Sequence, residues 1–385
     1  MGNKIKVLHV TPDSKFFDGV FRLWRNDENF DNIAVSIVKN KDCRFTYIKD
    51  TAELKILWNK RMVKKYLQTE EYDVVFLHSL PAILYNYIRY VPKDKAIIWW
   101  GWGYDIYTVQ KGLAPLIKIP LYKPLTKVFV RKENKLVRQL LSTIYLFVKN
   151  PLLGYRRKHA ISRIDYYQPV LSVEYGMMGN HDFFHAKEFY YKPGTRSYDS
   201  IQVKPSDGNI LLGNSATPTN NHLDVLSVVR VCRQSCQRII VPLSYGDQQY
   251  LKWLEPQIQE PYVQPIYDYL PSEDYYRIIG SCSYAVFGIV RQQAMGNILY
   301  ALNNGVKVFL YENSIAYKSL KMSGYVVFSI ESMTKESLTI PLTYSEIEQN
   351  HKAYALDYQR RCNIYTLCVD ELQTKFHLVN NKKCL

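Results

Sequence analysis

The stretch YAVFGIVRQQAMGNILYALNNGVKVFLYEN, residues 284–313, contains two apolar runs joined by a segment with helical spacing. Both runs are short and continuous, as is typical of strands in a parallel sheet that is covered on both faces. Three long polar side chains, Arg291, Gln292 and Gln293, directly follow the first run. Because ligands of such sheets lie beyond the carboxyl ends of the strands, this junction predicts a binding site.

The same alternation of short apolar runs and helical segments extends over the whole chain. Further runs that predict strands are KIKVLHV (4–10), YDVVFLHS (72–79), AIIWW (96–100), NILLGNS (209–215), RIIVPLS (238–244) and YVVFSI (325–330). A stretch rich in Pro, Gly and Ser at about 190–208 separates the two sets. The pattern therefore predicts an α/β protein with two Rossmann-like domains, residues 1–190 and 191–345, and a helical segment at 346–385.

Composition indicates a globular protein, and its cysteines predict no zinc site. The chain has 385 residues, 47% hydrophobic and 22% charged, which is enough material for two sizeable cores. No run of about 18 uncharged apolar residues predicts a transmembrane helix, and the N-terminus carries no apolar signal segment. The seven cysteines are scattered without a zinc spacing, so we expect reduced thiols in the cytoplasm and no cofactor.

Charge is concentrated in residues 111–163. This segment has thirteen basic residues and one acid, a net +12 of the +15 of the whole chain. Such a concentration predicts that one surface meets an anionic partner. Within the segment an apolar stripe recurs at three- and four-residue spacing beside basic side chains, and it consists of Val137, Leu140, Leu141, Ile144 and Val148. A basic amphipathic helix of this kind lies in a membrane interface; alternatively, the stripe packs on the first domain.

Other strand ends in the second half carry groups that suit a nucleotide. Gly213, Asn214 and Ser215 precede a helix that starts near Asn220, and a helix N-terminus attracts phosphate. Tyr245 follows the next strand, and Gly296 and Asn297 open the helix after Gln293. Arg291 can make paired hydrogen bonds to a diphosphate; the alternative is a structural ion pair with Glu312.

Several motifs together resemble the TDP-N-acetylfucosamine:lipid II N-acetylfucosaminyltransferase family, whose enzymes build enterobacterial common antigen on a polyprenyl carrier. The similar segments are FLHS (76–79), WWGWGYDIY (99–107), LLGNSATPTNNH (211–222), VPLSYG (241–246) and residues 284–313. The resemblance covers most of the chain up to about residue 330. It implies a GT-B glycosyltransferase fold, with a cleft between the two domains and the nucleotide sugar held mainly by the second.

The resemblance also implies which residues contact the donor. Carried over by motif, these are Gly213, Asn214, Ser215, Asn220, Arg291, Gln292, Gln293, Glu312 and Asn313. This chain departs from the family pattern at Gly101–Asp105 and at Ser79, where the family has glycine after the histidine. These departures bear on the exact donor and acceptor rather than on the superfamily.

The leaving nucleoside diphosphate must be neutralised as it departs. The sequence has no Asp-x-Asp motif, so we expect a metal-independent reaction in which Arg291 and helix N-termini supply the positive charge. Candidates for the base that acts on the acceptor hydroxyl are Asp105, His78 and Asp13, in that order. For Asp105 and Asp13 the alternative is a helix cap or turn. Retention and inversion at the anomeric carbon both stay open.

The sequence thus predicts a glycosyltransferase that moves a sugar from a nucleotide sugar to a polyprenyl-diphosphate-linked saccharide at the inner face of the cell membrane. One alternative is a basic protein that binds nucleic acid or a membrane surface without catalysis, although no recognition motif accompanies the charge. A nicotinamide enzyme is disfavoured, because Ile106 stands where the third glycine of the dinucleotide fingerprint belongs.

Overall fold

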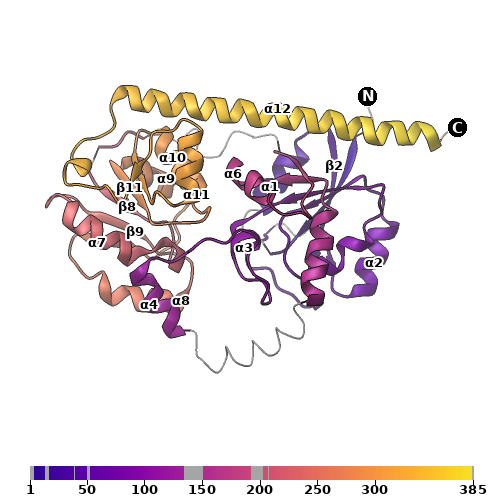
Figure 1. Cartoon of the computed structure of the whole chain (residues 1–385), viewed down its shortest axis with the longest axis horizontal. Helices are drawn as coiled ribbons and strands as arrows, with labels where there is room; N and C mark the ends of the chain where they lie inside the picture. Colours follow the sequence, from indigo (N-terminus) through magenta and orange to yellow (C-terminus); the bar gives the residue numbers. More distant parts are fainter. Residues whose placement is uncertain are drawn as a thin grey trace. The chain divides into compact units, whose positions relative to one another are not determined.

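The computed structural model describes residues 4–13, 17–38, 40–49, 53–133, 151–191, 203–206 and 208–383. The chain forms two compact α/β units. Unit 1 contains residues 1–118, 142–194 and 360–385, and unit 2 contains residues 119–141 and 195–359. Both units are visible in Figure 1.

Unit 1 is built on a parallel sheet of seven strands in the order β3-β2-β1-β4-β5-β6-β7. The strands are β1 (Ile5–Thr11), β2 (Phe30–Ile37), β3 (Leu54–Leu57), β4 (Val74–Leu77), β5 (Ala96–Trp100), β6 (Tyr166–Gln168) and β7 (Lys187–Glu188). Its helices are α1 (Phe17–Arg25), α2 (Lys60–Thr69), α3 (Gly103–Tyr107) and α6 (Ser172–Met178), with a further helical stretch at 151–162. The sheet centre is apolar, since β4 is buried at every position.

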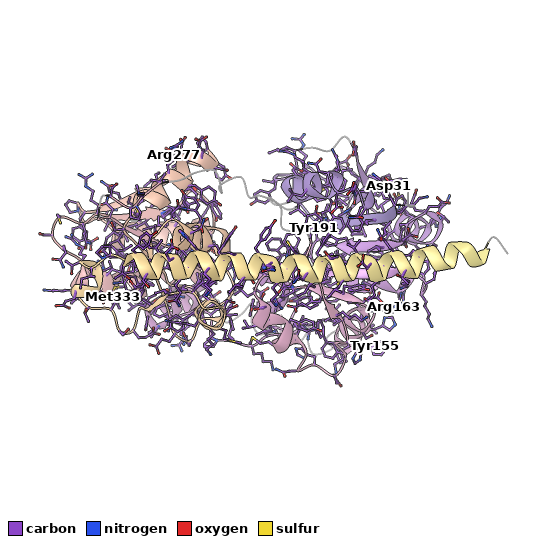
Figure 2. The ribbon with its side chains drawn as sticks, turned by 90° about the horizontal axis from the view of Figure 1, so that it is seen from above. Asp31, Tyr155, Arg163, Tyr191, Arg277 and Met333 are labelled. Carbon is purple, nitrogen blue, oxygen red and sulfur yellow. The ribbon has the colours of Figure 1, made fainter. Side chains whose placement is uncertain are left out.

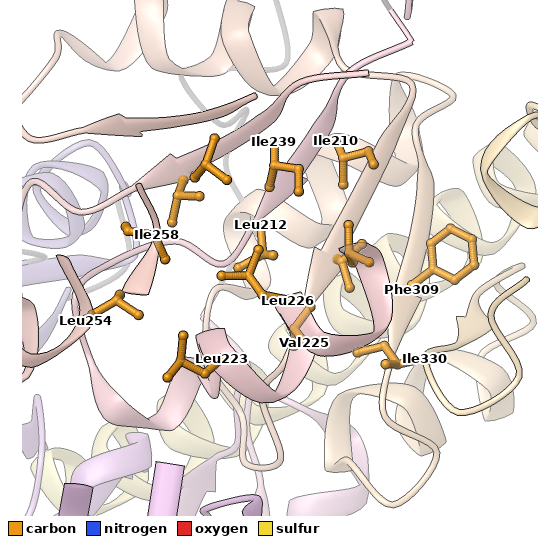
Figure 3. Packing of buried hydrophobic residues seen from close by; sticks show 14 of the residues in the cluster. Ile210, Leu212, Leu223, Val225, Leu226, Ile239, Leu254, Ile258, Phe309 and Ile330 are labelled. Carbon is orange, nitrogen blue, oxygen red and sulfur yellow. The ribbon is translucent and has the colours of Figure 1, made fainter. Parts of the chain in front are cut away.

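Unit 2 is built on a parallel sheet of six strands in the order β10-β9-β8-β11-β12-β13. The strands are β8 (Ile210–Leu212), β9 (Ile239–Pro242), β10 (Val263–Ile266), β11 (Tyr284–Phe287), β12 (Lys307–Leu310) and β13 (Phe328–Ser329). Its helices are α4 (Pro124–Glu133), α7 (His222–Cys232), α8 (Gln248–Leu254), α9 (Ser272–Ser281), α10 (Met295–Asn303) and α11 (Ile315–Met322). Side chains of β8, β9 and β12 pack against α7 in one core (Figure 3).

Burial explains why the apolar runs of unit 2 become strands. Every residue of β8, β11 and β12 is buried, as expected of a parallel sheet with helices on both faces. Because such runs have no polar face, their polar residues are left for the strand ends. The strand order places β8 beside β11, so the polar residues that follow these two strands lie at the same edge.

The C-terminal segment is one continuous helix, α12 (Tyr344–Lys383), drawn in yellow in Figure 1. Its first part belongs to unit 2, where Asn350 Oδ1 accepts a hydrogen bond from Val326 N at 2.7 Å. Its later part belongs to unit 1, where Tyr365, Val369 and Leu372 join the core. A single helix therefore stabilises both units.

The basic segment 111–163 is divided between the units. Lys123, Lys127 and Arg131 belong to unit 2, whereas Lys111 and residues 151–163 belong to unit 1. The sequence-based boundary at residue 190 places all of them in the first domain. The predicted apolar stripe, Val137, Leu140, Leu141, Ile144 and Val148, lies outside the described residues, as do Lys135, Arg138 and Lys149.

Candidate active site

Two glycines allow loops of unit 2 to pack tightly at the strand ends. Gly213 follows β8 with a φ of +71°, a conformation that side chains other than glycine rarely adopt. Gly288 follows β11, and a Cβ there would lie 2.3 Å from the carbonyl oxygen of Asn220 and 2.4 Å from a methyl of Val225. The loop after β8 can therefore pack directly on the end of β11 only because residue 288 has no side chain.

Asn221 holds this loop in place. It is fully buried in the left-handed conformation, with a φ of +49°. Its Nδ2 donates to the carbonyl of Gly288 at 2.7 Å, which ties the start of α7 to the end of β11. The next-door Asn220 is also buried, and its Nδ2 donates to the carbonyl of Ser215 at 2.7 Å.

A network of side-chain hydrogen bonds connects three loops at this edge. Gln293 Nε2 donates to Asn214 Oδ1 at 3.1 Å, and its Oε1 accepts from Thr219 Oγ1 at 2.6 Å. Asn214 Nδ2 in turn donates to the hydroxyl of Tyr245 at 2.9 Å. Thr217 Oγ1 accepts from both Gln293 and Asn220. Amide and hydroxyl groups that bond to one another in this way are well suited to rearrange around a polar ligand.

Arg291 lies at the centre of the same edge, between strand β11 and helix α10. Its Nη1 donates to the carbonyl of Gln292 at 2.7 Å. The N-cap of α10 is Ala294, whose φ of +56° turns the chain sharply into the helix. Gly296 and Asn297 form its first turn, and Asn297 Nδ2 donates to the hydroxyl of Tyr275 at 2.9 Å. This helix N-terminus and the guanidinium together offer positive charge to an anion.

Glu312 and Asn313 follow β12 and are both exposed. The backbone N–H of Glu312 donates to Glu331 Oε2 at 3.1 Å, and Asn313 Oδ1 accepts from Lys123 Nζ at 3.3 Å. Lys123 also lies over the ring of Tyr311, with Nζ 3.7 Å from its centroid. A cation from the middle of the chain, which also lies 3.6 Å from Glu331 Oε1, is thus present beside Asn313, one of the predicted donor residues.

Two side chains hold the segment that carries Lys123 to unit 2: Asn221, the N-cap of helix α7, and Asp224 within that helix. Lys123 N donates to Asn221 Oδ1 at 2.8 Å. Asp224 accepts from Leu125 N at 2.8 Å and from Thr126 N at 2.9 Å, so it caps the N-terminus of α4. Figure 1 shows α4 beside α7 and α8. Lys123 was not among the predicted site residues, because in the sequence it belongs to the basic segment and to none of the motifs.

Tyr122 belongs to the same segment. Burial raises the pKa of its hydroxyl, while the positive charge of Arg291 lowers it and the charge of Asp247 raises it. The structure therefore brings together, at one edge of unit 2, the ends of β8, β11 and β12 and the segment before α4.

The three predicted bases lie in unit 1, and two of them are occupied by backbone donors. Asp105 is buried; its Oδ2 accepts from Leu80 N at 2.9 Å and Trp99 Nε1 at 3.0 Å, and its Oδ1 accepts from Trp102 N at 2.7 Å. Burial raises the pKa of Asp105 to about 7, although these hydrogen bonds oppose the shift. Such a pKa suits a base, but the contacts favour a role in holding the loop after β5.

Asp13 makes a similar set of contacts. Its carboxylate accepts from the backbone N–H groups of Thr46, Tyr47 and Ile48 at 2.7, 2.9 and 3.1 Å. Burial raises the pKa of Asp13, but the three N–H donors outweigh it, so the pKa is lowered overall. The three contacts anchor the 46–48 loop, so they favour a structural role for Asp13.

His78 differs from both carboxylates, because its partner is another side chain. It follows β4, is buried, and its Nε2 lies 3.0 Å from Nδ1 of His9. Burial lowers the pKa of His78 well below its usual range. The ring is therefore neutral at pH 7, as a general base must be.

Neither a metal cluster nor a membrane-spanning helix is found in the part of the chain that the structure describes. No group of three His, Cys, Asp or Glu side chains there could hold a metal ion. Of the described helices, none is both long and apolar enough to cross a bilayer.

Part of the chain matches the model of a known protein family. Residues 180–354 match the model of a family described as 4-alpha-L-fucosyltransferase, glycosyl transferase group 56. This match confirms, for the part of the chain that contains the strand-end residues of unit 2, the resemblance to a fucosaminyltransferase family.

Solved glycosyltransferases share the fold over nearly the whole chain. One is an α,α-trehalose 6-phosphate synthase from Burkholderia multivorans, with a TM-score of 0.57, 8% identity, and coverage of 100% of this chain and 99% of that one. Another is an α-glucosyltransferase in complex with UDP, with a TM-score of 0.54, 9% identity, and coverage of 96% and 100%. A third, involved in avilamycin A biosynthesis, has a TM-score of 0.50, 12% identity, and coverage of 96% and 97%. The predicted GT-B fold is thereby confirmed.

Proposed function

We propose that this protein, which has the GT-B fold, is a nucleotide-sugar-dependent glycosyltransferase that transfers an N-acetylated deoxyhexosamine, such as N-acetylfucosamine, to a polyprenyl-diphosphate-linked saccharide. The product would be an intermediate of a bacterial surface polysaccharide. The family match to fucosyltransferases supports a deoxyhexose donor. The similar α-glucosyltransferase that is in complex with UDP supports a nucleotide in the donor.

One observation carries the assignment of the donor site: the polar network at the edge of unit 2. Asn214, Gln293 and Tyr245 come from three different loops and hydrogen-bond to one another. Arg291 and the N-terminus of α10 lie at the same edge. A sugar nucleotide needs both kinds of group, since its sugar and base take neutral hydrogen bonds and its diphosphate takes positive charge.

The proposed mechanism uses positive charge from the protein to stabilise the leaving diphosphate. As the bond from the anomeric carbon to the diphosphate oxygen breaks, the electron pair stays on that oxygen. Arg291 hydrogen-bonds to it, and the first N–H groups of α10 stabilise the remaining charge. We propose that the reaction needs no metal ion, and activity that persists after chelation of divalent cations would test this.

The acceptor hydroxyl needs a base from unit 1. Asp105 and Asp13 accept three hydrogen bonds each from their own unit, and protonation would weaken these bonds because it removes the negative charge of the acceptor. His78 is neutral and has one ring nitrogen engaged by His9. The proposal therefore assigns the base to His78, ahead of the two carboxylates.

The deciding experiment measures transfer by the purified protein. A panel of nucleotide sugars that includes TDP-N-acetylfucosamine is offered with a polyprenyl-diphosphate-linked disaccharide, and the product is detected by mass spectrometry. We expect turnover with an N-acetylated deoxyhexose donor and none with the acceptor omitted. Transfer only to a water-soluble acceptor would refute the lipid-linked acceptor.

A lipid-linked acceptor requires the enzyme to reach the membrane, and we propose that helical residues 151–162 lie on its cytoplasmic face. Leu152 and Tyr155 are one turn apart and are 56% and 67% exposed, so this helix presents two large apolar side chains close together on its surface. Figure 2 shows Tyr155 extending outward. Arg156 and Lys158 add positive charge nearby. Exposed apolar and basic side chains on one helix match the chemistry of an anionic bilayer surface.

Two basic residues of this region, Arg157 and Arg163, have structural roles within unit 1. Arg157 Nη1 donates to the carbonyl of Ala114 at 2.6 Å, and Arg163 donates to the carbonyls of Val91 and Pro92, so both hold unit 1 together. They should be left unchanged.

Sedimentation with anionic and neutral liposomes provides that test. The variant that combines Leu152→Ser, Tyr155→Ser, Arg156→Gln and Lys158→Gln should lose binding to anionic vesicles. A control with Lys64→Gln and Lys65→Gln on α2 should keep it. Binding that ignores lipid charge, or that survives in the first variant, would contradict the docking proposal.

A further inference from the structure

A chain of hydrogen bonds links two buried histidines to the backbone of helix α1 in unit 1. His78 Nε2 lies 3.0 Å from His9 Nδ1, and His9 Nε2 lies 2.9 Å from Asn32 Oδ1. Asn32 Nδ2 donates to the carbonyl oxygen of Trp24 at 2.9 Å. His9, Asn32 and His78 come from the three neighbouring strands β1, β2 and the end of β4. No motif in the sequence connects these three residues.

The hydrogen bond from Asn32 to the carbonyl of Trp24 determines which atom donates in each of the other hydrogen bonds of this chain. A backbone carbonyl can only accept, so the Asn32 amide nitrogen must face Trp24 and the Asn32 oxygen must face His9. That oxygen can only accept, so Nε2 of His9 carries the proton. Burial lowers the pKa of His9 to about 4, so its ring is neutral and Nδ1 has a free electron pair.

The same logic then applies to the second ring. Since Nδ1 of His9 can only accept, Nε2 of His78 must donate to it. A neutral His78 with its proton on Nε2 has its electron pair on Nδ1. We propose that Asn32 and His9 are positioning residues that fix the tautomer of His78, so that Nδ1 of His78 accepts the proton of the acceptor hydroxyl. This inference rests on the proposed function, because it presumes His78 as the base.

The surroundings keep this arrangement from being disturbed by other charges. His9 packs edge-on against Phe21 and Trp24, with ring centroids 5.1 and 4.9 Å away, and His78 packs against Phe17 at 5.1 Å and Phe76 at 4.9 Å. Among the described residues, the one ionisable group that acts on His78 is His9, and none acts on His9. Helix α1 and strand β4 therefore face the pair with apolar rings.

The proton and the electrons balance in this step. The acceptor oxygen forms its bond to the anomeric carbon while its proton passes to Nδ1 of His78. The bond from that carbon to the diphosphate breaks, and the electron pair leaves with the diphosphate. The resulting imidazolium keeps its Nε2–H bond to His9, so the positive charge is stabilised by a hydrogen bond that already exists.

The experiment reads the tautomer directly, by ¹⁵N NMR of the full-length protein labelled at histidine. In the wild type we expect Nε2 of His78 to be protonated and Nδ1 bare, with the signals assigned by their loss in His78→Gln. A His78 that is protonated on Nδ1 would overturn the inference without any variant. This readout does not depend on activity, so it separates failure of the inference from failure of the proposed function.

Variants then connect the tautomer to turnover. Asn32→Ala removes the acceptor for His9, and we expect mixed tautomers of His78 and a kcat lower by about tenfold or more, with an unchanged KM for the donor. His78→Gln should lower kcat by about 10²- to 10⁴-fold. The acid limb of the kcat profile should lie below the ordinary pKa of histidine, because burial lowers the pKa of His78.

A control separates positioning from general destabilisation. Asn29→Ala removes an asparagine of the same unit whose side chain bonds to Asp27 at 2.9 Å, away from the histidines, and should change neither tautomer nor kcat. Unchanged kcat in Asn32→Ala with a mixed tautomer would show that the tautomer does not matter, and unchanged kcat in His78→Gln would show that His78 is not the base. Either result overturns the inference.

Discussion

The strand ends of the two units use polar side chains differently. In unit 2, Asn214, Gln293 and Tyr245 bond mainly to one another across loops. In unit 1, Asp105 and Asp13 bond mainly to backbone N–H donors, most of them in other loops of the unit. Both edges look alike in sequence, because in each a polar residue follows an apolar run.

This difference indicates which strand-end residues can bind a ligand or act in catalysis. A carboxylate that accepts several backbone N–H groups is a structural part of a loop, and replacing it leaves those donors without a partner. Side chains that bond only to other side chains can exchange a partner for a ligand at small cost. By this criterion unit 2 offers several side chains for binding, whereas of the three predicted bases in the described part of unit 1 it is His78 that has a ring nitrogen outside such contacts.

The largest expected effect on activity is at Arg291. Arg291→Ala should lower kcat/KM by about 10²- to 10³-fold while the protein still folds, because the leaving diphosphate loses its guanidinium. Arg291→Lys should recover only part of this, since an ammonium lacks the paired geometry. Steady-state kinetics with the donor below saturation would measure it. Arg277→Ala on α9, whose salt bridge with Glu273 is exposed, serves as control, and near-wild-type activity of Arg291→Ala would refute the donor site.

A second prediction tests the close packing behind the edge of unit 2. Gly288→Ala puts a methyl 2.3 Å from the carbonyl oxygen of Asn220, so the loop must shift and the free energy of unfolding should fall by about 1–3 kcal/mol. Chemical denaturation would measure the change. Gly19→Ala in α1, where the added methyl meets nothing within 4 Å, should not destabilise the protein. Equal stability of both variants would show that the glycine is not required.

The contrast between the units predicts a loss of stability at Asp105. In Asp105→Asn one oxygen becomes an NH₂ group that faces an N–H donor, so the free energy of unfolding should fall by about 1–3 kcal/mol. A simple helix cap would tolerate asparagine. Thermal unfolding and kcat should be measured together well below the melting temperature. Lost turnover with full stability would instead make Asp105 the base and would break the comparison.

The smallest effect is expected at Lys123. Lys123→Met removes the cation beside Asn313 and Tyr311, and the KM for the donor should rise by about fivefold, or ~1 kcal/mol. Lys123→Arg should restore most of the affinity. Lys127→Met, one turn along on the exposed face of α4, should have no effect on KM. Equal KM values for the two methionine variants would remove Lys123 from the donor site.

Much of the fold follows from local patterns in the sequence. Continuous apolar runs such as 284–290 are typical of strands in a parallel sheet that is covered on both faces, so they predict the strands and the edge where polar residues collect. The motif residues Gly213, Asn214, Arg291 and Gln293 were identifiable for the same reason, because each directly follows such a run.

The hydrogen-bond partners of these side chains could not be predicted from local patterns, because the two residues of such a pair are often distant in sequence. Lys123 meets Asn221 across 98 positions, and His9 meets His78 across 69. The sequence by itself determined two α/β units, the polar edge of unit 2 and the glycosyltransferase motifs. Only the tertiary structure decided that backbone N–H groups occupy Asp105 and Asp13, that the segment before α4 belongs to unit 2, and that Asn32 sets the proton positions on two histidines. Periodicity reports which face of an element is buried, but a hydrogen bond exists only where folding brings a particular donor to a particular acceptor.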